Sequence, residues 1–213
     1  MVRIPNRGRG DKDILDDEYV AVMSGGYGYP YPKIGSNVFI IDWATGKIKK
    51  RIDIEDMPND IVNSLPSTPV LVTARNSGAA EYTGALAYFA DLEGKITKIN
   101  LTNMEYEHAY DPTSNTLSLK TLPIELYDQT TLLNLEASRL FNNRFMYHSL
   151  EAGIGARDRK FWLYGGTGDY LNLNDVMVDA ASVNNLMFGI KDSHFPFFGH
   201  VNAVSYTHLT LPT

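Results

Sequence analysis

The sequence of 213 residues contains no cysteine, and it has no long apolar run. The first absence excludes disulfide bonds, thiolate metal sites and a cysteine nucleophile, but it does not fix the cellular compartment. The longest apolar stretches, such as residues 85–90, fall far short of the ~20 residues that a membrane-spanning helix needs. We therefore expect no membrane-spanning segment.

Strong charge of one sign is also missing. The formal net charge is −6 and the basic residues are scattered, so the basic patch that binds a phosphate backbone is not present. The glycine-rich segments 25–28 and 165–168 are not followed by the helix that would hold a phosphate group. No nucleic-acid partner is expected.

Sequence patterns of catalysis are absent as well. There is no Gly-x-Ser-x-Gly elbow that would present a serine nucleophile. The histidines do not have the spacing of a zinc-binding helix; they lie at positions 108, 148, 194, 200 and 208. A hydrolase interpretation therefore has no serine nucleophile to start from, and the histidines are expected to be surface or hydrogen-bonded residues.

A short phrase occurs twice. Asp42 precedes Gly46 and Lys47 in the first copy, and Asp91 precedes Gly94 in the second, each after an apolar run and before a strand-like segment. Such a pattern predicts a β-hairpin with a tight turn held by aspartate. The glycine returns 48 residues later, from 46 to 94, which is typical of propeller blades of roughly 40 to 50 residues.

The rest of the chain favours strands, with one helix. Mixed apolar spacing predicts a helical insertion over residues 127–142, and glycines predict a turn at 153–155. The expected fold is therefore all-β, a partial propeller of about three incomplete blades. The strands are expected at 19–23, 37–42, 47–54, 68–73, 84–91, 95–101, 116–120, 145–150, 160–164, 170–173 and 186–190.

Five segments in series resemble a known family. They resemble, in order, the signature segments of the carboxy-terminal, quinoprotein-like β-propeller of the PilY1 family of type IV pilus biogenesis and tip-adhesin proteins. The segments are residues 19–28, 38–42 with Thr45 and Gly46, 67–72, 89–101, and 164–171 ahead of 186–192.

The resemblance implies an exported bacterial protein at the pilus tip, the cell surface or the outer membrane and periplasm. It would support pilus assembly and adhesion without catalysis, with minor pilins or a host or abiotic surface as partners. Two alternatives stay open: a quinoprotein dehydrogenase that binds pyrroloquinoline quinone and calcium, and a scaffold propeller of the cell envelope. The dehydrogenase requires repeated tryptophan motifs, whereas this chain has two tryptophans.

Calcium is the cofactor that the resemblance suggests, because family members often carry a calcium loop. The corresponding stretch, residues 73–83, departs from that pattern: it offers Asn76, Ser77 and Glu81 and adds Arg75. A second set of closely spaced oxygen ligands provides the metal-site candidates. They are Asp169, Asn172, Asn174 and Asp175.

We expect three regions in the chain. Residues 1–17 form a flexible or partial lead-in, residues 18–202 form the incomplete propeller, and residues 203–213 resemble a non-native read-through tail. The chain is then an internal fragment. Loops 25–36 and 103–115 are the expected binding surfaces.

Overall fold

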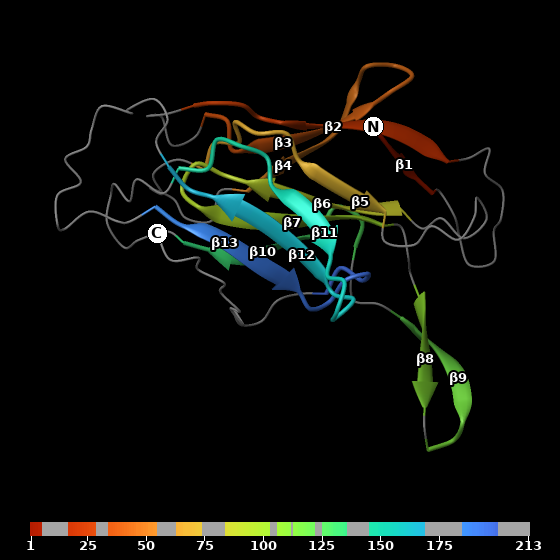
Figure 1. Ribbon diagram of the computed structural model, residues 1–213. Helices are drawn as coiled ribbons and strands as arrows, with labels where there is room; N and C mark the ends of the chain where they lie inside the picture. The colour runs from red at the N-terminus through yellow and green to blue at the C-terminus, as the bar shows by residue number, and fades with distance from the viewer. Residues whose placement is uncertain are drawn as a thin grey trace.

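The computed structural model describes the chain as three stacked antiparallel β-sheets and a separate hairpin (Figure 1). No helix occurs among the described residues, and the all-β prediction is confirmed for them. The described residues are 1–5, 17–28, 34–54, 63–73, 84–102, 106–111, 113–121, 125–135, 145–168 and 185–199.

Each sheet has its strands in chain order. The first sheet contains β1 (Val2–Ile4), β2 (Glu18–Ser24), β3 (Asn37–Asp42) and β4 (Ile48–Asp53). The middle sheet contains β5 (Val70–Thr73), β6 (Gly84–Ala90), β7 (Lys95–Thr102) and β10 (Gln129–Asn134). The third sheet contains β11 (Glu151–Ile154), β12 (Phe161–Gly166) and β13 (Met187–Asp192).

The remaining pair of strands stands apart. β8 (Tyr106–Asp111) and β9 (Thr116–Thr121) form a hairpin that projects away from the three sheets (Figure 1). It leaves the middle sheet after β7, and the chain then returns to that sheet as β10. β9 was predicted, whereas β8 lies within residues 103–115, which were expected to form a binding loop.

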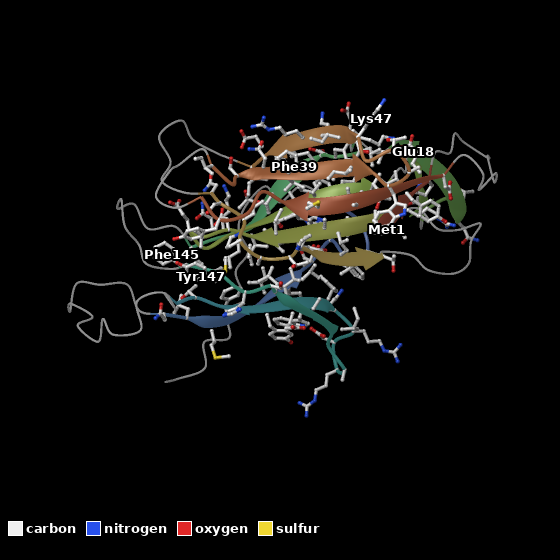
Figure 2. All side chains as sticks on the ribbon, turned by 90° about the horizontal axis from the view of Figure 1, so that it is seen from above. Met1, Glu18, Phe39, Lys47, Phe145 and Tyr147 are labelled. Carbon is white, nitrogen blue, oxygen red and sulfur yellow. The ribbon has the colours of Figure 1, made fainter. Side chains whose placement is uncertain are left out.

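The middle sheet is buried on both faces, because it lies between the other two (Figure 2). Side chains alternate along β6, so Ala85, Ala87 and Phe89 pack toward the first sheet. Leu86 and Tyr88 pack toward the third sheet. The near-continuous apolar sequence of β6 follows from this double burial.

The helix expected over residues 127–142 is wrong where the structure describes it. Residues 129–134 form β10, and a β-bulge between Thr131 and Leu133 shifts its register. Because the bulge inserts an extra residue, Leu132 and Leu133 are both buried although they are neighbours. This irregular spacing imitated a helical pattern; residues 136–142 lie outside the described ones.

The strand expected over 145–150 and the turn at 153–155 are also wrong. The strand begins later, as β11, and it contains Gly153 paired with Trp162 of β12. The turn that follows β11 covers residues 156–158. Gly153 therefore occupies a paired position within a strand, although glycine at this place in the sequence had indicated a turn.

The two copies of the repeated phrase lie at opposite ends of the stacked sheets. The turn after Asp42 lies at the start of β4. The second copy lies near the other end of β4, because the Nζ atom of Lys95 donates a hydrogen bond of 2.9 Å to the backbone oxygen of Ile54, just beyond that end. The first copy joins the third and fourth strands of its sheet, and the second joins the second and third. The interval of 48 residues therefore does not mark equivalent positions in the two sheets.

Candidate functional site

The two predicted turn aspartates hold their turns as expected. The Oδ1 atom of Asp42 accepts hydrogen bonds from the backbone N–H and the hydroxyl of Thr45, at 2.7 and 2.8 Å. These bonds lower the pKa of Asp42, the hydroxyl bond most. The Oδ1 atom of Asp91 accepts the backbone N–H groups of Glu93 and Lys95. Both carboxylates act locally on the backbone.

The predicted metal ligands Asp169, Asn172, Asn174 and Asp175 lie outside the described residues, as do residues 74–83. The calcium site stays a prediction. Within the ranges that the structure does describe, no three histidine, aspartate or glutamate side chains gather as metal ligands. Those same ranges contain no helix long and apolar enough to cross a membrane.

A buried ion pair joins the middle and third sheets. The Nζ atom of Lys98 lies 2.6 Å from Oδ2 of Asp192, and neither side chain is accessible to solvent. Lys98 also donates to the backbone oxygens of Phe197 and Phe198, at 2.9 and 2.5 Å. Since all three ammonium protons have acceptors, the pair satisfies the condition for a stable buried charge.

The aspartate of this pair has further partners. The hydroxyl of Tyr88 donates to Oδ2 over 2.8 Å, and the backbone N–H of His194 donates to Oδ1 over 3.0 Å. Burial lowers the pKa of Lys98, although Asp192 opposes the shift, and burial together with Asp192 raises that of Tyr88. With its partners saturated and no solvent access, this cluster fastens two sheets and is not an open reactive site.

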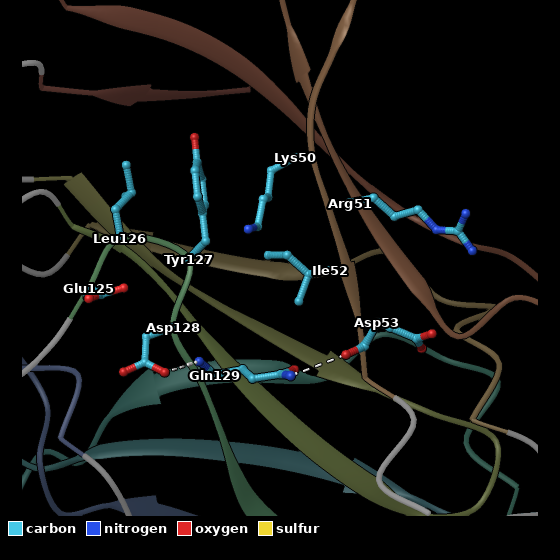
Figure 3. Close-up of a pocket in the computed structure, with 9 residues that line it drawn as sticks. All are labelled: Lys50, Arg51, Ile52, Asp53, Glu125, Leu126, Tyr127, Asp128 and Gln129. Atoms are coloured by element: carbon cyan, nitrogen blue, oxygen red, sulfur yellow. Dashed lines mark hydrogen bonds between the residues drawn. The ribbon is translucent and has the colours of Figure 1, made fainter. Parts of the chain in front are cut away.

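An accessible groove lies at the rim between the first and middle sheets (Figure 3). It encloses about 620 Å³. One wall comes from β4 and the other from the segment that enters β10. The lining residues are Lys50, Arg51, Ile52, Asp53, Glu125, Leu126, Tyr127, Asp128 and Gln129.

Asn100 of β7 fixes the second wall. Its backbone oxygen accepts the N–H of Tyr127 and its N–H donates to the backbone oxygen of Asp128, both at 2.8 Å. Its side-chain Nδ2 donates to the backbone oxygen of Glu125, also at 2.8 Å. These three hydrogen bonds join the turn to one nearly inaccessible residue of β7.

Tyr127 has an unusual backbone conformation for its residue type. Its φ angle is 71°, in the left-handed region that bulky residues rarely adopt. Strain of this kind persists where the surroundings impose it, and it is concentrated at binding and catalytic sites. Burial, followed by the charge of Glu18, raises the pKa of the phenol, so Tyr127 is neutral at physiological pH.

Polar side chains of both signs line the groove. Lys50 and Ile52 point toward Tyr127, and Arg51 points away (Figure 3). The Nε atom of Arg51 donates to Oδ1 of Asn37 over 2.6 Å. The lining contains cations, carboxylates and an aromatic ring, but no serine, cysteine or histidine nucleophile. Such a surface is suited to binding.

A comparison with models of protein families, with curated proteins and with solved structures found no match to this chain.

The groove residues Lys50–Asp53 were predicted as a strand, but residues 125–129 fell partly in the expected helix. The β-branched pair Thr130 and Thr131 next to this segment was the available signal for a strand. The expected binding loops are described only in part: 29–33, 103–105 and 112 lie outside the described residues.

Proposed function

We propose that this chain is part of a non-catalytic β-propeller similar to that of the PilY1 family. In this proposal it is exported, lies at the pilus tip or cell surface, and supports pilus assembly and adhesion. Minor pilins or a host or abiotic surface are the proposed partners. The basis is the ordered resemblance of five segments together with the way the sheets are stacked.

The observation that carries the propeller is a cross-strand pair that occurs in two successive sheets. In the middle sheet Tyr88 of β6 lies opposite Lys98 of β7, on the face that receives the third sheet. The Nζ atom of Lys98 is 5.9 Å from the centroid of the Tyr88 ring. The aromatic residue is on the second strand and the lysine on the third.

The third sheet repeats this arrangement on its outer face. Trp162 of β12 lies opposite Lys191 of β13, and the Nζ atom of Lys191 is 5.3 Å from the Trp162 ring. Leu163, between the outward-facing Trp162 and Tyr164, points into the core. Propeller blades are similar sheets repeated around a central axis, so the same pair of residue types in two successive sheets supports that architecture.

The distribution of tryptophan argues against the quinoprotein enzyme. Trp43 is 63% exposed in the turn after β3, and Trp162 lies on the outer face of the third sheet. Neither therefore docks between two of the stacked sheets. A full-length protein that oxidised alcohols with a dye acceptor, after quinone and calcium were added, would overturn the non-catalytic proposal.

Deletion of the encoding gene in its bacterial host tests the pilus function. The expected result is fewer surface pili and weaker attachment to a solid surface, both restored by the intact gene. A deletion strain with normal pilus number and normal attachment would reject the proposal. An envelope scaffold would instead leave pilus number unchanged while a partner protein lost its place in the envelope.

A further inference from the structure

We propose that the groove beside β4 binds an extended segment of a partner protein, which adds as a strand to the first sheet and places one acidic side chain near Lys50. The inference names the partner class of the binding function proposed above and rests on that function. Strand addition takes its affinity from backbone hydrogen bonds and its specificity from pockets for alternate side chains.

β4 has a free edge for such a strand. It is the last strand in the order β1-β2-β3-β4, so one of its sides has no strand partner within the described part of the chain. Two hydrogen bonds show which backbone groups face that side. The backbone N–H of Ile54 donates to the backbone oxygen of Ser36 and so points toward β3. The backbone oxygen of Asp53 points to the opposite side, where it accepts a hydrogen bond from Nε2 of Gln129.

Backbone groups alternate in direction along a strand, so Arg51 presents its N–H and oxygen to the same side as Asp53. This side faces the groove (Figure 3). The side-chain amide of Gln129, at 3.2 Å from the oxygen of Asp53, occupies the position of one backbone donor of a neighbouring strand. An incoming segment would continue this ladder at Arg51.

The walls of the groove define the side chains that the segment needs. Ile52, Leu126 and Tyr127 offer an apolar position, and the ammonium group of Lys50 lies on the same side of β4 as Ile52 (Figure 3). Alternate residues of an added strand project to one face. One apolar and one acidic residue, two positions apart, would therefore meet Ile52 and Lys50.

Charge distinguishes this partner from a second copy of the chain. Lys47, Lys49, Lys50 and Arg51 lie in or next to β4, so two copies paired through β4 would bring like charges together. The opposite wall carries the carboxylates of Glu125 and Asp128. A segment with a single acidic residue fits this mixed lining better than a uniformly acidic one.

The probe is a fluorescein-labelled, end-blocked peptide of alternating threonine and valine with one central glutamate. Its anisotropy is measured against the full chain, at concentrations below those of self-association. The glutamate peptide should bind saturably. A matched peptide with lysine at the centre should bind about tenfold more weakly, because a like charge then faces Lys50. A peptide methylated at alternate backbone nitrogens should lose binding.

Three variants of the protein complete the test. Lys50→Glu should reverse the preference, so that the lysine peptide binds about tenfold more tightly than the glutamate peptide. Arg51→Pro removes a groove-side N–H without removing one from the β3 ladder, and it should abolish binding. Thr45→Ala, in the exposed turn before β4 and outside the groove lining, is the control and should bind like the parent.

The proposal is overturned if the glutamate peptide does not bind, if Lys50→Glu leaves the preference unchanged, or if the methylated peptide binds normally. The charge reversal decides the outcome even where Arg51→Pro does not fold. Failure of peptide binding with a normal deletion phenotype in the host rejects this inference alone. Normal pilus number together with normal attachment in the deletion strain rejects the proposed function, whatever the peptide does.

Discussion

Lys98 of β7 and Asp192 of β13 form an ion pair of 2.6 Å that joins two sheets across 94 residues of sequence. The pair is inaccessible to solvent and lies in a cluster with the rings of Tyr88 and Phe198. Burying two charges costs several kcal/mol each, and the attraction offsets this cost only with good geometry and additional hydrogen bonds. Both conditions are met, because the Nζ atom of Lys98 has two further acceptors and Asp192 has two further donors.

Replacing Asp192 by alanine should therefore lower the free energy of unfolding by about 3–5 kcal/mol, because Lys98 is left buried without its counter-ion. Chemical denaturation of parent and variant measures the difference. The matched control is the double variant Lys98→Met with Asp192→Leu, which removes both charges and should recover most of the loss. A single variant as stable as the parent would show that the pair does not hold the sheets together.

Alkaline pH should destabilise the protein through its buried tyrosines. The pKa values of Tyr88 and Tyr127 are raised from the ordinary 10.0, by burial first and then by Asp192 and Glu18 respectively. Above pH 10 the unfolded chain loses these protons while the folded chain keeps them. The unfolded state then binds fewer protons, so stability falls as pH rises.

Lys98 has the opposite effect, because burial lowers its pKa in the folded chain below the ordinary 10.5. The folded chain then loses this proton before the unfolded chain does, so the contribution of Lys98 to the free energy of unfolding grows as pH rises toward 10.5. Comparing parent and Tyr88→Phe isolates the tyrosine. The variant should lose about 1.5–3 kcal/mol at neutral pH with its hydrogen bond to Asp192, and its stability should fall less steeply above pH 10. If the free energy of unfolding fell equally steeply with pH in parent and variant above pH 10, Tyr88 would not be a source of the alkaline destabilisation.

Local patterns predicted the strands that alternate cleanly, and they failed where the alternation is interrupted. The strand predicted over 37–42 matches β3, where the buried Val38 and Ile40 alternate with the more exposed Phe39 and Ile41. The bulge in β10 placed Leu132 and Leu133 both in the core, and a pattern of period two could not describe them. Lys98 carries a charge that ordinarily indicates an exposed position, and its partner lies far along the chain.

The groove was not predictable for a similar reason. Its two walls, residues 50–53 and 125–129, are far apart in sequence and carry no motif that links them. They meet because β4 and β10 lie at the same rim of two stacked sheets, which Gln129 and Asp53 join. Hairpin turns, by contrast, depend on adjacent residues, and both aspartate turns were predicted.

Replacing Asn100 by alanine should loosen the groove without unfolding the sheets. The side chain holds the backbone oxygens of Glu125 and Thr102, at 2.8 and 3.2 Å, and loss of these bonds at a buried position costs about 1–3 kcal/mol. Hydrogen exchange of the amides of Tyr127 and Asp128 should accelerate. Thr45→Ala, in a distant exposed turn, is the control and should leave the exchange of both amides unchanged. Unaltered exchange in the Asn100 variant would show that the Asn100 side chain does not hold this wall of the groove.

The outer face of the third sheet should cause this chain to self-associate. Tyr164 is 48% exposed and Met187 is 66% exposed on this face, and the ring of Tyr164 lies over Gly189, where a Cβ atom would come within 2.9 Å of it. The face therefore carries exposed apolar side chains beside the charged Lys191 and Glu151, and exposed apolar side chains on a sheet face promote association. Replacing Tyr164 and Met187 together by threonine should lower the mass measured by light scattering toward that of a monomer. Glu151→Gln, on the same face, is the control and should not lower it, whereas a parent chain that is already monomeric at every concentration would reject the prediction.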